Sequence, residues 1–393
     1  MGKFKLSLGD DPKEKKKNIA RAIILVLAVV VAVVAFTKAV LSVSYKEPGY
    51  YKLDAAVEEG VPAYGADVEF IAYFEGTANE VKLQIRTADK LYSDSLLWAY
   101  KMFNAKELFP GYTNLASVNS SVKDWDVVMM SSAPYSSVVQ PAYQSPEFQF
   151  APQVYNAILD AYEKTCRQCG YNLFAGALYD AWKEILILDD AAAFDPINDS
   201  YQAERIEKLA AASSSLSNFR VEIASASQYK LRFTVSESYV RLLEELECDI
   251  NIIDLNLLHD SYMMQEVFSR MQAEGYEDCV IQGSNGLIAA NGRNIGSESS
   301  FSRVPVEDSD IYYYTVKDAS GKEHYRSLFF NVYTGEQFDI AEYTKVDMIG
   351  KFELLDTVWL NLQLSNAKDA DELKAIADKI NAMEGVSAEY KLY

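Results

Sequence analysis

Few side chains in this sequence combine a reactive type with an informative position. There are only two histidines, His259 and His324, so a histidine-rich metal site is excluded and a histidine-based triad has two candidate bases. His259 directly precedes Asp260, and such a pair could act as a general base. The same pair, at the junction of a loop and a helix, is more often a feature of the surface. Both interpretations stay open at this point.

The four cysteines form a second group that could do chemistry. Cys166 and Cys169 make a single C-x-x-C motif, whereas Cys248 and Cys279 each stand alone. A zinc site would need a second pair of cysteines, and a redox motif would normally begin a helix rather than end one. The simplest interpretation is four buried or incidental thiols. A disulfide outside the cell, or a catalytic or metal-binding role, is the alternative.

Hydrophobic periodicity predicts the elements that would position these groups. Helices are expected at 89–108, 152–166, 173–187, 195–213, 260–274 and 369–384. Strands are expected at 68–74, 78–87, 219–224, 230–236, 248–255, 278–283 and 387–393. Residues 109–149 show no regular period. Because strands and helices alternate without a strict βαβ rhythm, the sequence predicts one mixed α+β domain over 65–393, in one lobe or two.

The N-terminus has the pattern of a membrane anchor. Residues 1–21 carry seven basic and three acidic side chains, and residues 22–43 are uncharged except for Lys38. As a helix this run would be about 33 Å long, enough for a hydrocarbon core of about 30 Å. The basic flank favours the cytoplasm, so 44–64 would be a linker and 65–393 the extracytoplasmic domain of a single-pass cell-membrane protein. A cleaved signal peptide is the alternative.

Composition narrows the range of partners. Hydrophobic residues make up 49% of the sequence, too many for a disordered chain and enough for one large or two modest domains. The formal net charge at pH 7 is -20. A general nucleic-acid binder needs a basic face for the phosphate backbone, so no nucleic-acid partner is expected. The partner that the sequence itself indicates is the membrane, through the N-terminal helix.

The order of five landmarks resembles the FAD:protein FMN transferase family, the ApbE-like flavin transferases. The segments are FEGTANEVKL (74–83), YTNLASVN (112–119), CGYNLFAGALYDAW (169–182), the stretch from IDLNLLHD to GSNG (253–286), and FFNVYTGEQF (329–338) with LLDTVWLNL (354–362). The resemblance covers about residues 70–365. The third segment is the strongest match, and its positions in step with the family are Tyr171, Asn172, Gly176, Leu178 and Trp182.

This resemblance implies an ApbE-like α+β fold, with mixed sheets and packed helices, behind one transmembrane helix. It implies FAD and Mg²⁺ as cofactors, and transfer of FMN from FAD onto a Thr or Ser of an acceptor protein. The residues that it places at a flavin site are Glu75, Gly76, Thr77, Asn172, Asp254, Asp260, Ser284, Asn285 and Gly286. It gives Asp356 as a metal ligand and leaves the catalytic residue unknown. We therefore expect Gly76, Asn172, Asp254 and Asp356 around one cavity.

Several of these residues also have a simpler structural interpretation. Asp254 and Asp260 could cap or stabilise the start of a helix. A G-S-N-G turn at 283–286 could hold a phosphate, but such turns more often just supply a positive φ. Asp356, close to an apolar helix, fits either role.

Departures from the family pattern count against catalysis. Asn256 and Leu257 stand where the family has two glycines, so their side chains are expected to crowd a diphosphate. Asp260 stands where the family has a lysine; at ~4 Å and an effective dielectric of about 20, reversing that charge costs roughly twice 4 kcal/mol before screening. Only an intervening cation would restore binding. Leu360 replaces the threonine that would help Asp356 to hold Mg²⁺.

Two functions therefore remain from the sequence. We expect a divergent, non-catalytic flavin-binding or scaffold module that is anchored in the membrane. The alternative is an active, magnesium-dependent FAD:protein FMN transferase. Either protein would work beside a flavin-acceptor or redox partner protein.

Overall fold

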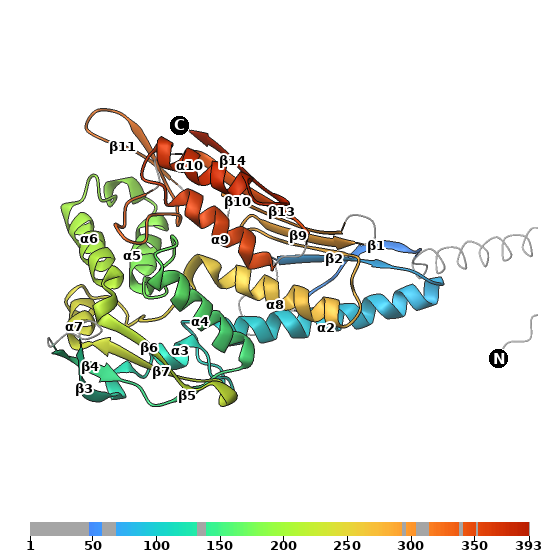
Figure 1. Ribbon diagram of the computed structural model, residues 1–393, viewed down its shortest axis with the longest axis horizontal. Helices are drawn as coiled ribbons and strands as arrows, with labels where there is room; N and C mark the ends of the chain where they lie inside the picture. Colours follow the sequence, from blue (N-terminus) through green and yellow to red (C-terminus); the bar gives the residue numbers. More distant parts are fainter. Residues whose placement is uncertain are drawn as a thin grey trace, which may run out of the picture. The chain divides into compact units, whose positions relative to one another are not determined.

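The computed structural model describes residues 47–56, 68–131, 139–292, 296–303, 314–337, 341–350 and 353–392. The chain divides into two compact units. The described part of the smaller unit is residues 47–49 and 74–86, and the larger unit holds Tyr50–Tyr73 and the chain from Thr87 onward. Figure 1 labels the helices and strands. Each unit is described by itself below.

The smaller unit contains the start of a long helix, α2 (Ala78–Phe103). The backbone N–H and the hydroxyl of Thr77 donate to the Glu80 carboxylate at 2.7 and 2.8 Å, which closes the first turn. The backbone hydrogen bond from Thr77 is the main reason that the pKa of Glu80 is lowered. The prediction of a strand at 78–87 is therefore wrong: the alternating apolar residues of this segment lie in the first turns of a helix.

A seven-stranded sheet is the largest element of the fold. Its strand order is β1-β2-β8-β9-β10-β13-β14, and the pairs from β2 to β8 and from β8 through to β14 are antiparallel. The strands are β1 (Gly49–Lys52), β2 (Val68–Phe74), β8 (Cys279–Gly283), β9 (Leu287–Gly292), β10 (Gly296–Arg303), β13 (Ala341–Ile349) and β14 (Val386–Leu392). The predicted linker 44–64 thus contains a strand, β1.

Three helices pack against this sheet. They are α8 (His259–Ala273), α9 (Leu354–Ser365) and α10 (Ala370–Asn381). Helix α8 contacts β8, α9 contacts β10 and β13, and α10 contacts β14 (Figure 1). The core between the last two helices and the sheet includes Val346, Leu364, Leu373 and Ile380, all nearly inaccessible to solvent. Removing such side chains from water is the main source of stability for this layer.

A second sheet lies in the larger unit. It consists of β3 (Asp126–Ser131), β4 (Val139–Gln144), β5 (Phe148–Gln149), β6 (Phe219–Ser225) and β7 (Lys230–Ser236), with β7 at the centre. The short helix α7 (Glu237–Glu245) packs against β4 and β7, and another short helix, α3 (Leu115–Asn119), precedes β3 in the chain. The sequence predicts β6 and β7 correctly. It misses β3, because Val127 and Met129 are apolar yet exposed and hide the alternation.

Five predicted helices are confirmed: α8 and α10, described above, and α4 (Pro152–Cys166), α5 (Gly176–Leu186) and α6 (Ser200–Ser214). The starts of α4 and α6 have clear local causes. Pro152 occupies the first turn of α4, where a missing N–H costs nothing, and the Asp199 carboxylate accepts from two N–H groups of α6.

A small hairpin of β11 (Tyr314–Lys317) and β12 (Glu323–Arg326) is attached through a buried ion pair. The Arg326 guanidinium donates to the fully buried Asp195 carboxylate at 2.6 Å, and the Tyr314 hydroxyl donates to the same carboxylate at 2.7 Å. The hairpin is thereby fixed to the connection between α5 and α6.

Residues 248–255 do not form the predicted strand. They have no regular secondary structure and lead into a short 3-10 helix, Asn256–Leu258. The Asn119 side chain takes the place of a neighbouring strand. Its Oδ1 accepts from the N–H groups of Ile252 and Ile253 at 3.0 and 3.1 Å, and its Nδ2 donates to the Ile253 carbonyl at 2.9 Å.

Two further expectations concern the N-terminus and the cysteines. Within the described residues, none of the helices has the length and apolar character needed to cross a bilayer, and the predicted tail and anchor at 1–43 lie outside those residues. All four cysteines are free thiols: Cys166 is exposed, Cys169 and Cys248 are half-buried and Cys279 is buried. Burial raises the pKa of the Cys279 thiol to about 12.

Candidate functional site

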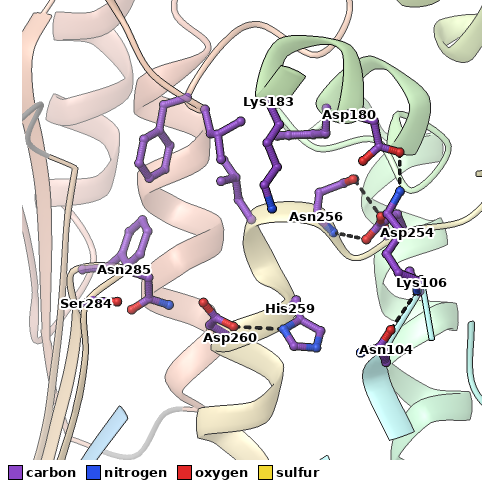
Figure 2. Close-up of a pocket in the computed structure, with 16 residues that line it drawn as sticks. Asn104, Lys106, Asp180, Lys183, Asp254, Asn256, His259, Asp260, Ser284 and Asn285 are labelled. Carbon is purple, nitrogen blue, oxygen red and sulfur yellow. Dashed lines mark hydrogen bonds and ion pairs between the residues drawn. The ribbon is translucent and has the colours of Figure 1, made fainter. Parts of the chain in front are cut away.

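The larger unit contains a cavity of about 380 Å³ (Figure 2). Its polar lining consists of Asn104, Lys106, Asp180, Lys183, Asp254, Asn256, His259, Asp260, Ser284 and Asn285. Its apolar lining consists of Ala105, Tyr179, Leu257, Phe301, Leu328 and Phe329. The cavity thus joins three carboxylates, two ammonium groups and an imidazole with an apolar wall.

One buried amide holds two of the carboxylates. Asn251 Nδ2 donates to Asp180 Oδ2 at 3.1 Å and to Asp254 Oδ2 at 2.9 Å. Asp180 also forms an ion pair with the Lys106 ammonium (Figure 2). The negative charge of Asp180 is therefore balanced by a cation on the same wall of the cavity.

The position of Asn251 depends on two neighbours. Asn119 Nδ2 donates to Asn251 Oδ1 at 2.9 Å, which leaves both hydrogens of the Asn251 amide for the carboxylates. Gly176, the first residue of α5, makes room for this amide: a Cβ there would lie 2.5 Å from its carbon and nitrogen atoms. The sequence resemblance includes both Asn119 and Gly176, and the structure gives each a role in placing the acidic pair.

The turn between Asp254 and Asn256 differs from the expectation. Asn256 has φ 53°, and its backbone N–H donates to Asp254 Oδ1 at 2.8 Å. Its side chain turns into the wall, where Nδ2 donates to the carbonyls of Asp254 and Asn172 at 3.0 and 3.3 Å. Asparagine tolerates this left-handed conformation. The predicted crowding of the cavity therefore applies to Leu257 more than to Asn256.

His259 and Asp260 begin α8 and face the cavity together. His259 Nδ1 lies 2.9 Å from Asp260 Oδ1 (Figure 2). Burial opposes ionisation of Asp260, but the hydrogen bond with His259 and the charges of His259 and Lys183 outweigh it, so the pKa of this carboxyl is lowered. Asp260 is therefore an anion at neutral pH.

Lys183 enters the same cavity from α5, one helical turn after Asp180 (Figure 2). Within the described ranges of the chain, no carboxylate lies within ion-pair distance of its ammonium. The other lysine of the cavity, Lys106, is paired with Asp180.

The turn between β8 and β9 supplies Ser284 and Asn285. Asn285 Oδ1 accepts from the Leu287 N–H at 3.0 Å, and its Nδ2 donates to the Ser261 hydroxyl at 3.3 Å. Gly286 has φ +87°, and a Cβ there would lie 2.2 Å from the Ser302 carbonyl of β10. Gly286 is therefore needed for the close approach of two strands, and it is not part of the cavity lining.

The remaining predicted residues lie elsewhere. Asn172 is completely buried behind the cavity wall, and its Oδ1 accepts from the Phe174 N–H at 3.0 Å. Asp356 lies in the first turn of α9, where it accepts from the Glu353 N–H at 3.2 Å. The expectation that Asn172 and Asp356 line the same cavity as Asp254 is thus wrong. Glu75, Gly76 and Thr77 belong to the smaller unit.

The described residues do not fit a magnesium site. Mg²⁺ needs several oxygen ligands in near-octahedral geometry. No cluster of three His, Cys, Asp or Glu side chains suited to a metal occurs in the part of the chain that the structure describes. The amide of Asn251 bridges two of the cavity's carboxylates, Asp180 and Asp254, and Asp356 caps the start of a helix.

Two buried polar atoms in the wall lack a partner within the described residues: Asn172 Nδ2 and Asn256 Oδ1. They lie in side chains that the Asn256 hydrogen bond to Asn172 brings together. Such orphaned atoms are costly in a folded core and are found where a ligand or water completes the site. Asn256 lines the cavity, whereas Asn172 does not.

Sequence reasoning missed four residues that shape this site: Lys106, Asp180, Lys183 and Asn251. A signal was available for two of them, because Asp180 and Lys183 are three residues apart on a predicted helix and so share one face. Lys106 lies in the predicted helix 89–108 and Asn251 in the predicted strand 248–255, but neither residue is in a helix or strand of the structure. The predicted periodicity therefore gives no guide to where these two side chains point.

A larger cavity of about 1000 Å³ lies between α6 and the segment around Gly335. Its charged lining includes His324, Arg326 and Lys368. Arg326 is held by Asp195, and none of the predicted site residues lies there. The smaller cavity is therefore the candidate site.

The sequence matches no protein-family model and no curated protein. Among solved structures, the ApbE protein of Thermotoga maritima aligns over 87% of this chain and 94% of its own, with a TM-score of 0.51 at 12% identity. Flavinyl transferase ApbE from Pseudomonas stutzeri covers 88% and 95%, with a TM-score of 0.49 at 10% identity. Flavin transferase ApbE from Vibrio cholerae covers 88% and 97%, with a TM-score of 0.46 at 11% identity. The chain has an ApbE-like α+β fold, as the sequence resemblance predicted.

Proposed function

We propose that this chain is a membrane-anchored flavin-nucleotide-binding module that holds its ligand without transferring it. The observation that carries the proposal is that every carboxylate of the cavity is already engaged by another protein group. These pairs are Asp180 with Lys106 and Asn251, Asp254 with Asn251 and Asn256, and Asp260 with His259. A transferase would need some of these oxygens for a metal ion.

The cavity suits part of a flavin nucleotide. A volume of about 380 Å³ lies within the ~300–1,000 Å³ typical of small-molecule sites. Phe301, Phe329 and Leu328 offer an apolar wall for a ring system, while Ser284 and Asn285 offer hydrogen bonds. Bound FAD would bring the reactive diphosphate, and this chain's own residues would orient it and exclude water.

Ligand-dependent heat stability tests flavin binding. The full-length protein in detergent would be heated with FAD or FMN at about 100 times the dissociation constant, where binding adds about 2.7 kcal/mol of stability. We expect a clear rise in the melting temperature. The absence of any rise with both nucleotides, up to millimolar concentration, would reject the proposal.

A transfer assay separates the two functions. The full-length protein would be incubated with FAD, MgCl₂ and a flavin-acceptor protein, and covalent flavin would be detected by its fluorescence on a denaturing gel. We expect none above a control without the protein. Covalent flavin on the acceptor would identify the chain as an active transferase and overturn the non-catalytic part of the proposal.

The location of the protein is part of the same proposal. The apolar run at 22–43 and its basic flank support a single-pass anchor with the folded domain outside the cytoplasm. A flavin-acceptor or redox protein at that surface would be the partner. Protease added to intact cells should digest residues 44–393 and spare the N-terminal tail; protection of the domain would contradict this topology.

A further inference from the structure

Among the described residues, Lys183 is the one lysine of the cavity without a hydrogen bond or ion pair to a neighbouring side chain. Helix α5 places Asp180 and Lys183 one turn apart on the face that lines the cavity. Asp180 is neutralised by Lys106, whereas the Lys183 ammonium has no ion pair within the described part of the chain. In Figure 2 the Lys183 side chain extends into the space that His259 and Asp260 also face.

The other polar groups around Lys183 are suited to an anion. Ser284 and Asn285 line the same cavity from the turn between β8 and β9, and both side chains can donate hydrogen bonds. An ammonium group is a compact charge with three donors, which suits a phosphate. The competing charge is Asp260, whose carboxylate His259 already engages at 2.9 Å.

We infer that Lys183 binds the phosphate of the ligand and makes the cavity select phosphorylated flavins over riboflavin. This inference rests on the proposed flavin-binding function and names its substrate class. It also answers the difficulty posed by Asp260, because Lys183 is the intervening cation between that carboxylate and an incoming phosphate. The family's lysine aligns with Asp260 on α8, whereas Lys183 lies on α5.

The first test is flavin binding by the full-length protein in detergent, followed by quenching of flavin fluorescence. FMN and riboflavin would be titrated against the natural protein and against Lys183→Met, which keeps the apolar stem and removes the charge. A lost charge-assisted hydrogen bond weakens FMN binding about 10- to 100-fold. Riboflavin binding should stay unchanged, and Lys183→Arg should keep most of the FMN affinity.

A matched control is available on α10. Lys374 is exposed, has no ion pair within the described residues and lies outside the cavity lining. Lys374→Met changes the net charge by the same amount, so it should leave both flavin affinities unchanged. An equal loss of FMN affinity in this variant would show a general charge effect and overturn the inference.

A second variant is expected to change the FMN affinity in the opposite direction. Asp260→Asn removes the carboxylate that repels a phosphate, so the affinity for FMN should rise while the affinity for riboflavin stays the same. A fall in FMN affinity would mean that Asp260 helps to bind the ligand, which contradicts the role given to Lys183.

The outcomes distinguish this inference from the function on which it rests. If riboflavin and FMN bind equally well and Lys183→Met changes neither, the flavin site stands and the role of Lys183 is rejected. If Lys183→Met weakens both flavins alike, the lysine acts through packing, and the inference is again rejected. If neither flavin binds, the proposed function and the inference both fail.

Discussion

At the scale of single residues, Asn256 shows that a side chain in place of a glycine need not block a cavity. It stands where the resembling family has a glycine, and it adopts φ 53° with its side chain turned into the wall. Asparagine is among the few residues that visit this conformation at modest cost. The backbone path is thereby kept, and Leu257 is the side chain that narrows the cavity.

The His259–Asp260 pair predicts a specific pH dependence. A lowered pKa means that ionised Asp260 stabilises the fold above the unfolded-state value of about 3.9, and that this stability is lost as the pH falls through the lower folded value. His259→Asn should raise the pKa of Asp260, because it removes the charge and alters the hydrogen bond. Carboxyl NMR titration would measure the shift.

An internal reference exists for that titration. His324 lies 3.0 Å from Asp318 and lowers the pKa of that carboxyl in the same way. The pKa of Asp318 should not change in the His259→Asn variant. An unchanged pKa for Asp260 would show that His259 does not stabilise its charge.

Gly286 gives a second prediction for a single residue. Gly286→Ala would strain a φ of +87° and drive a Cβ against the Ser302 carbonyl, whereas Gly275→Ala strains a φ of +95° in open space. We expect about 1–2 kcal/mol of destabilisation for Gly275→Ala and about 1–3 kcal/mol more for Gly286→Ala. Urea unfolding would measure both. Equal losses would contradict the close contact with β10.

At the scale of elements, the irregular segment 248–255 before Asn256 is held by one side chain instead of a neighbouring strand. The Asn119 side chain bonds to N–H groups and a carbonyl of this segment and also to Asn251. Helix α3, which carries Asn119, therefore fixes the position of Asp180 and Asp254 at the cavity. A sheet ladder would fix many residues at once. Here a single buried amide does so, which makes the site sensitive to one position.

Asn119→Ala should therefore be strongly destabilising. It would leave the buried N–H groups of Ile252 and Ile253 without an acceptor, at about 1–3 kcal/mol each. Asn198, which is exposed and donates once to the Ala192 carbonyl, offers a control whose alanine variant should lose about 1 kcal/mol or less. Chemical unfolding would compare them, and a loss below about 1 kcal/mol for Asn119→Ala would contradict the role of this side chain.

Sequence periodicity predicts an element best where packing and local signals agree. Helix α4 has an apolar face and a proline in its first turn, so its bounds follow from the sequence. The segment 78–87 alternates like a strand, but the Thr77–Glu80 contact and the continuous helix beyond it decide otherwise. In 248–255 the apolar run correctly predicts burial of Ile252, Ile253 and Leu255, yet burial alone does not show whether the partner is a strand or an amide.

The candidate site was predictable in part for the same reason. Asp254, Asp260, Ser284 and Asn285, which the resemblance places at a flavin site, all line the cavity. Their role there stays a prediction. The contribution of α5 could not be predicted, because the sequence of a buried helix does not show which of its faces lines a cavity.

At the scale of the whole molecule, charge is the dominant feature. A net charge of -20 implies self-repulsion that salt should screen. Raising the NaCl concentration from 10 to 150 mM shortens the Debye length from about 30 to about 8 Å, so the melting temperature should rise. KCl serves as a control against a specific effect of sodium. A fall in melting temperature with both salts would show that attractive ion pairs outweigh the repulsion.

The unequal exposure of the four thiols makes the natural protein ready for spectroscopic labelling. Cys166, at the end of α4, is the exposed one, while the Cys279 thiol is buried and stays protonated at neutral pH. A maleimide fluorophore should therefore react first at the end of α4. Energy transfer between that dye and a bound flavin would then report ligand arrival without any engineered cysteine.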